Sequence, residues 1–343
     1  MRRPWLSCVV LRVLLNEHQV YSTGAGAIPD LISDSPRIVL TGTLAIDYVA
    51  AYPGVFSELP RHPGINLAVQ LESIERRFGG CAMNIAYTLR LLGNDPVPFV
   101  YVGKDFDNEY AAHLRACGVD MSGIHLVDAP HSAHAFIFTD NDQNQFTGFF
   151  GGPGPTVEFG PELRRHSSGF EFGVLAPDLP ANMITAARAL REGGVPFLTD
   201  PGQNLTDFCA DEATELIAQS TAVIVNEFEY LRLRDLVADG LNALDLVVVT
   251  EGERGVRWYS KAEGDGRERA VAARIVDPTG CGDGFRGGFV HARLRGSPIS
   301  EAVRTGAVTA AMVLETAGTQ SHRCEDFGAR YRRSWGHLPE WSG

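Results

Sequence analysis

Residues 277–289 read DPTGCGDGFRGGF, and this stretch decides the fold. Gly280 and Gly282 allow a sharp backbone turn that points N–H groups toward a ligand. Such amides, at the positive end of the helix that follows, form an anion site. The β-branched stretch VAARIV at 271–276 predicts a strand before the turn. The whole run therefore predicts a strand, a glycine turn and a helix that together hold an anion.

Asp283 lies in the first turn of this helix, beside the predicted anion site. A carboxylate repels an anion, so Asp283 is unsuited to bind phosphate, but it can take a proton from an attacking hydroxyl. The structural alternative is a glycine-rich turn with an acidic helix N-terminus, which would suffice for a bare G-x-G-D. No G-x-x-x-x-G-K-[ST] motif is present, which excludes a P-loop enzyme.

A second glycine motif, Gly79-Gly80-Cys-Ala-Met-Asn84, begins another predicted helix. The double glycine permits close approach of the backbone to a ligand, and Asn84 offers a donor and an acceptor. Asp47 ends the first predicted strand. Each feature has an ordinary alternative, because many helices follow glycines and an Asp at a strand end often forms a turn.

Short apolar, β-branched runs alternate with helical patterns along the chain, which indicates a parallel sheet covered by helices. The predicted strands are 37–50, 96–103, 195–200, 221–226 and 243–250. We predict one α/β domain over 37–330, a disordered extension over 1–36 and a C-terminal tail over 331–343. The stretches 48–78 and 131–150 break the rhythm and predict short strands that form a lid over a cleft, or a surface hairpin without a role.

The composition and net charge of the chain restrict its possible partners and its cellular compartment. Hydrophobic residues make up 44% of the chain, charged residues 21%, and the net charge is −12. This balance argues against a nucleic-acid polymer as partner, because phosphate-backbone binding needs clustered Lys and Arg. The six cysteines lack a C-x-x-C pair, which indicates reduced thiols and a cytoplasmic protein.

Two further features of the sequence, its N-terminal stretch and a pair of histidines, do not change this interpretation. The N-terminal stretch MRRPWLSCVVLRVLL resembles a secretory signal, but Arg12 interrupts its apolar part. We therefore expect a dispensable extension, and no apolar run long enough for a membrane span is present. His131 and His134 lie three residues apart, and we expect ordinary structural roles for them, because no cysteine lies near them.

The two glycine motifs resemble the paired signatures of the PfkB/ribokinase family, in the family's order. The resemblance covers roughly residues 37–320, and it extends to three further motifs: Gly42–Asp47, Asn226-x-x-Glu229 and Thr250-x-Gly252-x-x-Gly255. Within the family, FSELP at 56–60, Gln145–Phe150 and Glu315–Gln320 are most similar to bacterial adenosine kinases. The implied fold is ribokinase-like: a mostly parallel central sheet, helices on both faces and a small β-strand lid.

The resemblance also implies roles for single residues. Asp283 matches the catalytic base, and the anion hole is matched by Gly280, Cys281 and Gly282. The groups that grip the substrate ribose are matched by Asp47, Gly79, Gly80 and Asn84. Candidates for the remaining substrate contacts are the lid aromatics Phe136, Phe149 and Phe150, together with Gln203.

Nucleotide and metal sites follow from the same resemblance. Asn226 and Glu229 match the motif that organises Mg²⁺ through water, and the nucleotide turn is matched by Thr250, Gly252 and Gly255. The backbone around Asp277 and Thr279, with the loop near Gly318, resembles a K⁺ site.

The implied activity is ATP-dependent phosphorylation of the 5′-hydroxyl of adenosine, or of a related purine nucleoside, to give AMP and ADP. The first alternative is a kinase of the same fold that acts on free ribose or fructose. The phenylalanine-rich stretch 136–150 favours a nucleoside, since a sugar needs polar walls. The alternative from another class is a non-catalytic nucleotide sensor, which the presence of Asp283 disfavours. Whether the protein forms a homodimer stays open at this point.

Overall fold

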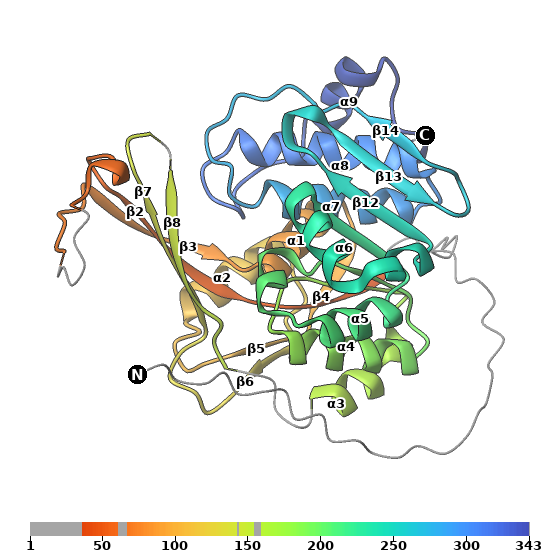
Figure 1. Ribbon diagram of the computed structural model, residues 1–343, viewed down its shortest axis with the longest axis horizontal. Helices are drawn as coiled ribbons and strands as arrows, with labels where there is room; N and C mark the ends of the chain where they lie inside the picture. The colour runs from red at the N-terminus through yellow and green to blue at the C-terminus, as the bar shows by residue number, and fades with distance from the viewer. Residues whose placement is uncertain (1–35, 61–66, 143, 154–158, 343) are drawn as a thin grey trace.

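The computed structural model describes residues 36–342, apart from 61–66, 143 and 154–158 (Figure 1). The predicted extension at 1–36 lies, except for Pro36, outside the described residues. The strands are β1 (Arg37–Thr41), β2 (Ala45–Ala51), β3 (Ser73–Gly79), β4 (Asp95–Pro98), β5 (Val100–Val102), β6 (Ile124–Leu126), β7 (Ala133–Thr139), β8 (Gln145–Phe150), β9 (Phe172–Leu175), β10 (Phe197–Thr199), β11 (Ala222–Asn226), β12 (Leu246–Thr250), β13 (Val256–Ser260) and β14 (Gly266–Glu268). The α-helices are α1 (Cys81–Leu91), α2 (Asn108–Cys117), α3 (Phe159–His166), α4 (Pro180–Glu192), α5 (Ala210–Gln219), α6 (Glu227–Val237), α7 (Cys281–Arg293), α8 (Ile299–Leu314) and α9 (Phe327–Trp335).

An eight-stranded sheet forms the centre of the molecule, in the order β14-β13-β12-β11-β10-β9-β1-β4. Within it, the strands β4, β1, β9, β10, β11 and β12 pair in parallel, whereas β13 and β14 pair antiparallel at one edge. The carboxyl ends of the parallel strands therefore meet along one side, where α/β sheets bind ligands. The predicted mostly parallel sheet is confirmed.

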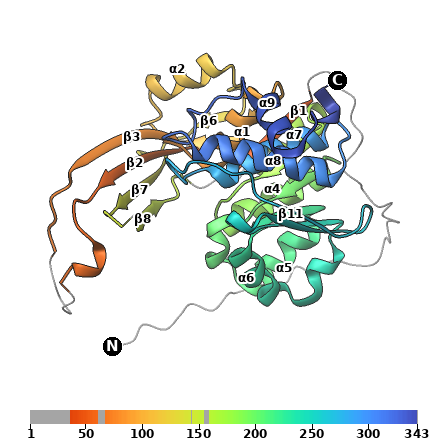
Figure 2. The ribbon, with the colours of Figure 1, turned by 90° about the horizontal axis from the view of Figure 1, so that it is seen from above.

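Helices cover both faces of this sheet (Figures 1 and 2). Ile38 and Leu40 pack in one apolar cluster with α1, α7 and α8, whereas Val39 between them packs in another with α4 and α5. Successive side chains of a strand point to opposite faces, so a strand buried on both sides must be apolar throughout. This requirement explains why the parallel strands lack polar alternation.

A smaller four-stranded sheet, in the order β3-β2-β7-β8, projects from one side of the domain (Figure 1). Strands β2 and β7 pair in parallel, and the outer pairs are antiparallel. Strands β7 and β8 lie within the predicted stretch 131–150, whereas β2 and β3 extend slightly beyond the predicted stretch 48–78 at its two ends. Asp140 closes the turn between β7 and β8, because its carboxylate accepts the backbone N–H groups of Asp142 and Asn144.

Three details differ from the sequence-based prediction. Residues 271–276 form no strand, since β14 ends at Glu268 and Ile275 is 70% exposed. The predicted strand 96–103 is broken at Phe99, whose N–H donates to Leu40, so that β5 pairs with β6 in a separate sheet. The boundary placed at residue 330 falls inside α9, whose Tyr331 is fully buried.

Two further observations concern the described residues alone. None of their helices combines the length and apolar character that a membrane crossing requires. The five described cysteines are all free thiols.

Candidate active site

The N-termini of α1 and α7 converge on a cleft of about 640 Å³ at the carboxyl ends of the parallel strands. Most of the residues predicted to form the site line this cleft: Asp47, Gly80, Asn84, Phe149, Gln203, Asn226, Glu229, Thr250, Gly252, Thr279, Gly280, Cys281, Gly282 and Asp283. Two glycine motifs from distant parts of the sequence are thus brought together at one cleft.

The glycine turn before α7 leaves room only for backbone. Gly280 caps the helix in the left-handed conformation, with φ +75°. A Cβ atom at Gly280 would lie 2.8 Å from the Thr319 side chain, so a larger residue would both strain and crowd the turn. The amides of Cys281 and Gly282 open α7, where the helix dipole favours an anion.

Asp283 is buried in the first turn of α7, where its carboxylate accepts a 2.8 Å hydrogen bond from Nδ2 of Asn84. Burial raises the pKa of Asp283 to about 6, although the nearby Arg286 guanidinium and the Asn84 bond oppose the shift. A carboxylate with this pKa is mostly ionised at neutral pH, yet basic enough to accept a proton.

Asp47 is the second buried carboxylate of the cleft. Gly79 makes room for it, since a Cβ at Gly79 would lie 2.0 Å from Oδ2 of Asp47. Burial and the negative charge of Asp283 raise the pKa of Asp47 to about 7, and the positive charge of Arg77 lowers it. Two hydrogen-bonding groups, Asp47 and Asn84, thus face the same part of the cleft.

Asn84 is oriented by a chain of hydrogen bonds behind it. Nε2 of Gln320 donates to Oδ1 of Asn84 at 3.0 Å and to the Tyr110 hydroxyl at 2.9 Å, and this hydroxyl donates to the Gly79 carbonyl. The acceptor oxygen of Asn84 is occupied by Gln320, so Nδ2 must face Asp283. Gln320 and Tyr110 were not predicted as site residues, although Gln320 ends the stretch Glu315–Gln320 that resembles bacterial adenosine kinases.

A buried ion pair beneath the glycine turn was also not predicted from the sequence. Nη2 of Arg286 donates to Oδ1 of Asp200 at 2.7 Å, and both side chains are buried. A Cβ at Gly282 would lie 2.7 Å from Nη1 of Arg286, so the guanidinium lies directly against the turn. The available signals were the spacing of three residues between Asp283 and Arg286, and the position of Asp200 at a strand end.

Asn226 and Glu229 form a reciprocal capping box at the start of α6. Oδ1 of Asn226 accepts the Glu229 N–H at 2.8 Å, and the Glu229 carboxylate accepts the Asn226 N–H at 2.8 Å. These bonds occupy Oδ1 of Asn226, the oxygen that a metal would use. The Glu229 carboxylate still lines the cleft, and the donor set fits Mg²⁺ held through water rather than by direct coordination.

A second cavity, of about 630 Å³, adjoins the cleft at the glycine turn. Thr250, Gly252, Cys281 and Gly282 line both cavities. The remaining wall is mostly small and apolar and includes Gly255, Val256, Ala270–Ala273, Ala307 and Ala311. This shape and chemistry suit a flat, apolar ring. Gly255 therefore lines the second cavity, whereas Thr250 and Gly252, the other residues of the predicted nucleotide turn, line both cavities.

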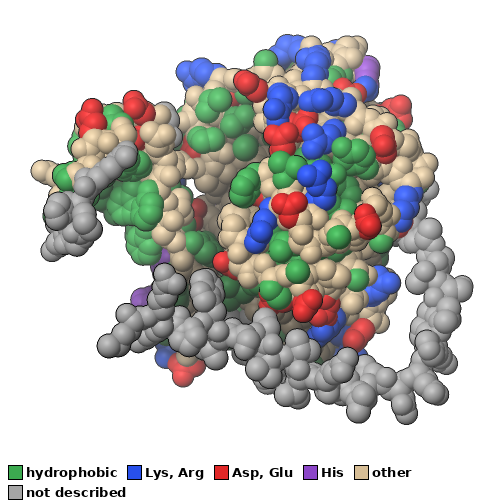
Figure 3. Space-filling view, in the orientation of Figure 1, with side chains coloured by type: hydrophobic (Ala, Val, Ile, Leu, Met, Phe, Trp, Pro, Cys, Tyr) green, Lys and Arg blue, Asp and Glu red, His purple; other side chains and the backbone are tan. Residues whose placement is uncertain are grey.

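The four-stranded sheet presents only part of its aromatic content to the cleft. Ala135, Ile137 and Phe149 line the cleft, whereas Phe136 and Phe150 lie on the opposite face. The assignment of Phe136 and Phe150 as substrate contacts is therefore wrong, because neighbouring residues of a strand alternate between faces. Figure 3 shows hydrophobic side chains gathered on this projecting sheet.

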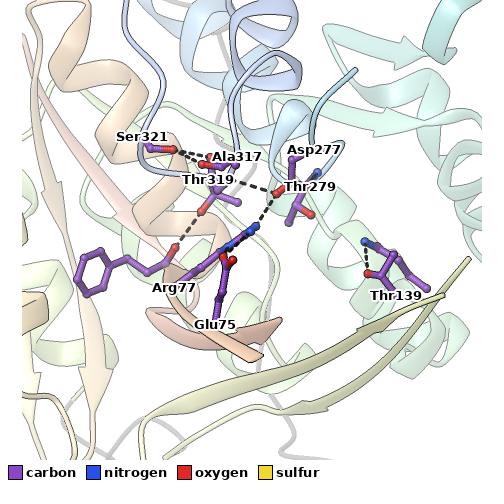
Figure 4. A network of polar contacts seen from close by, with 11 residues as sticks. Glu75, Arg77, Thr139, Asp277, Thr279, Ala317, Thr319 and Ser321 are labelled. Carbon is purple, nitrogen blue, oxygen red and sulfur yellow. Dashed lines mark hydrogen bonds and ion pairs between the residues drawn. The ribbon is translucent and has the colours of Figure 1, made fainter. Parts of the chain in front are cut away.

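The side chain of Asp277, a residue whose backbone belongs to the predicted K⁺ site, is bound by protein groups (Figure 4). Its Oδ2 accepts from Nη1 of Arg77 at 2.7 Å and from the Gly318 N–H at 3.1 Å, and its Oδ1 accepts from the Thr279 N–H. Arg77 lies on β3, so this ion pair ties the projecting sheet to the glycine turn. These three donors occupy the Asp277 carboxylate, and the K⁺ site on the backbone of Asp277 and Thr279 stays a prediction.

Comparison with known proteins identifies the family. Residues 36–325 match the pfkB family of carbohydrate kinases. This chain belongs to that family. The kinase is 30% identical to the solved nucleoside kinase of Burkholderia thailandensis in complex with inosine, with a TM-score of 0.79 over 88% of this chain and 99% of that chain.

Curated relatives include both nucleoside and sugar kinases. A nucleoside kinase of Methanocaldococcus jannaschii is 29% identical over 292 residues, which is 83% of this kinase and 93% of the relative. The probable fructokinase-6, chloroplastic, of Arabidopsis thaliana is 26% identical over 280 residues, or 75% and 70% of the two chains. The predicted family and ribokinase-like fold are confirmed. The finer likeness to adenosine kinases is not supported by these relatives, which are named more broadly.

Proposed function

We propose that this kinase transfers the γ-phosphate of ATP to the 5′-hydroxyl of a purine nucleoside, with adenosine as the first substrate to test. The observation that carries the proposal is the meeting of two cavities at Cys281 and Gly282, with Asp283 beside the junction. A nucleoside in one cavity and ATP in the other would bring the hydroxyl and the γ-phosphate to the same turn.

The proposed reaction needs positioning and charge stabilisation more than covalent chemistry. Asp283 accepts the proton of the 5′-hydroxyl, and the hydroxyl oxygen forms a bond to the γ-phosphorus. The bond from the γ-phosphorus to the bridging oxygen breaks, and ADP leaves with that oxygen. The backbone amides of the turn stabilise the negative charge on the transferred phosphoryl group.

Metal chemistry enters this proposal through the acidic wall of the cleft. Mg²⁺, when bound, supplies positive charge to the phosphates, and Glu229 would hold it through water. Arg286 adds one fixed positive charge beneath the turn, and its pairing with Asp200 keeps the guanidinium in place. Asp47 and Asn84 bind and orient the ribose hydroxyls, which sets the direction of the attacking oxygen.

The preference for a nucleoside over a free sugar rests on the far wall of the cleft. Ala135, Ile137 and Phe149 offer an apolar surface on which a base can stack, and a sugar would leave that surface unused. The nucleoside kinases among its relatives agree with this preference.

The proposal is tested by measuring ADP release with MgATP and each of adenosine, inosine, guanosine, cytidine, ribose and fructose. The expected result is the highest kcat/KM with a purine nucleoside. A higher kcat/KM with ribose or fructose would establish the sugar-kinase alternative. Binding of ATP and nucleoside without turnover of any substrate would support the non-catalytic sensor.

A further inference from the structure

The projecting sheet carries a third cavity, of about 480 Å³, on the face away from the active-site cleft. Its lining includes Arg76 of β3, Asp105 of the loop after β5, His131 just before β7 and His134 within β7. None of these four residues lines the cleft proposed to bind substrate. The cavity therefore requires an explanation of its own.

Three potential ligand atoms converge there. Oδ2 of Asp105 lies 3.2 Å from Nδ1 of His131 and 3.4 Å from Nε2 of His134, and all three atoms lie within 4.8 Å of one another. In a tetrahedral zinc site with bonds of about 2.0–2.1 Å, ligand atoms are separated by about 3.3–3.4 Å. Both separations from Asp105 match this spacing before any metal is present. His131 is mostly exposed and can close the third separation by a side-chain rotation.

The surrounding hydrogen bonds orient the ligands as a metal requires. Nδ1 of His134 lies 3.1 Å from the Ser132 carbonyl oxygen, so that nitrogen carries a hydrogen and the other, Nε2, faces Asp105. Oδ1 of Asp105 accepts from the N–H of Ser132 at 2.6 Å and from its hydroxyl at 2.8 Å, which leaves Oδ2 for the cluster. In metal sites, hydrogen bonds from neighbouring groups to the ligand side chains fix the orientation of those ligands.

The local charge also favours a cation. Arg76 is the positive group of this wall, and it is paired with Asp107 at 2.6 Å and with Glu109 at 2.9 Å. These two carboxylates offset the charge of the guanidinium, and Asp105 adds a further negative charge to the cavity lining.

We propose that Asp105, His131 and His134 bind one Zn²⁺ ion, or a similar first-row divalent metal, with a water molecule in the fourth position toward the cavity. Imidazole and carboxylate ligands suit such metals. The site joins the first residues of β7 to the loop after β5. Since His134 precedes Ala135 of the active-site wall, the metal would also fix the base of the strand that carries this wall.

The test is a titration of the full chain with Zn²⁺ alone, after dialysis against a chelator and without nucleotide. Calorimetry should give one site, Co²⁺ should give the visible absorption of a tetrahedral complex, and Zn²⁺ should raise the melting temperature. His131→Ala should weaken binding at least 10-fold and remove the absorption. Because His131 is exposed, this variant should fold normally, and His134→Gln supplies the second ligand deletion.

His337→Ala provides the matched control, because His337 is an exposed histidine far along the chain from the cluster. This variant should bind Zn²⁺ as the unmodified chain does. If His131→Ala and His134→Gln both retain the affinity of the unmodified chain, or if Zn²⁺ binds only in the millimolar range, the three residues form a histidine–carboxylate cluster and the proposal fails. Neither outcome depends on kinase activity, so the proposed function is tested separately.

Discussion

Asn84 and Asp283 lie 199 positions apart in the sequence, yet Nδ2 of Asn84 donates to Oδ2 of Asp283 at 2.8 Å. The bond joins the first turns of α1 and α7, each of which begins after glycine. Both helices direct their positive ends at the same cleft. Because Gln320 holds the opposite side of the Asn84 amide, the direction of this bond is determined by the protein and not by a ligand.

Asp283→Asn should lower kcat by about 10²–10⁴-fold, the usual effect of losing a general base. Asn is nearly the same size and keeps an acceptor oxygen for Asn84, so the fold and the turn should survive. Its carboxamide cannot take the hydroxyl proton. The measurement is kcat with adenosine and MgATP, accompanied by a thermal melt and a nucleoside titration.

The outcome of Asp283→Asn separates catalysis from structure. Nucleoside affinity should change little, because Asp47 and the apolar wall are intact. Loss of a buried charge should leave the melting temperature unchanged or higher. A variant that keeps more than a tenth of the original kcat would refute the assignment of Asp283 as base.

The pH dependence of kcat/KM should report both buried carboxylates. Burial raises the pKa of Asp283 to about 6 and that of Asp47 to about 7, and each is proposed to act as the ionised form. We therefore expect kcat/KM to fall as the pH drops below about 7, with a slope that approaches two protons below about 6, and to level off above about 8. A flat profile between pH 5 and 8 would contradict this assignment.

Asp47→Asn supplies the control for the pH profile. Because one titrating carboxylate remains in this variant, kcat/KM should fall at low pH with a slope of only one proton.

The same substitution should also change the stability of the protein in a direction that follows from the pKa. The pKa of Asp47 is higher in the folded protein than its ordinary value of 3.8, so the carboxyl favours folding at low pH and loses that contribution as the pH rises toward 7. Asp47→Asn should therefore raise the melting temperature of the ligand-free protein at pH 8 relative to the unmodified chain, and should have less effect at pH 4.

The local parts of the site were predictable from the sequence. A glycine turn at a helix N-terminus specifies its own backbone shape, so the helices predicted after Gly79-Gly80 and within residues 277–289 are both present. Gly42 breaks the predicted strand 37–50 into β1 and β2, because its backbone has a positive φ and lies against Ala176. In each case a few neighbouring residues determine the conformation.

The parts that were missed depend on pairing between distant segments. Arg286 and Asp200 are 86 residues apart, and no local pattern brings them together. Phe136 was placed on the wrong face, because the register of β7 decides which of two neighbours faces the cleft. Residues 271–276 have strand-like composition, yet the sheet ends at β14 and provides no partner there.

Arg77→Gln should destabilise the protein by about 1–3 kcal/mol, a value between those for exposed and buried ion pairs. Its partner Asp277 has a side chain only 13% exposed, so the carboxylate would lose its charged donor in a mostly buried place. The positive charge of Arg77 also lowers the pKa of Asp47, so its removal should raise KM for the nucleoside at pH 7. Thermal melts and steady-state kinetics measure the two effects.

The same variant tests whether the Asp277 carboxylate takes part in the K⁺ site that was predicted on the backbone around Asp277 and Thr279. In the unmodified kinase Arg77 occupies the Asp277 carboxylate, so replacing K⁺ by tetramethylammonium should change kcat by less than about twofold, within the weak range of exposed ion interactions. In Arg77→Gln the carboxylate is open to a cation, and K⁺ should restore part of the lost activity. An equal K⁺ response in both proteins would mean that Arg77 does not compete with the cation.

Phe149 and Phe136 form a matched pair for the base-binding wall, since each side chain is 45% exposed but they lie on opposite faces of the projecting sheet. Phe149→Ala should remove stacking worth about 1–3 kcal/mol per base, which corresponds to a rise of roughly 5- to 150-fold in KM for the nucleoside. The kcat should fall less, because Asp283 and the glycine turn are untouched.

Phe136→Ala removes the same ring from the other face, where it stacks on Tyr48 at a centroid distance of 5.5 Å. We expect a comparable loss of stability in the projecting sheet and no change in KM. Kinetics with adenosine and with ribose should be measured for both variants, because ribose has no base and its KM should respond to neither. Equal effects of the two substitutions on the KM for adenosine would indicate that the ring acts only through sheet stability, and the apolar wall would then not be the base site.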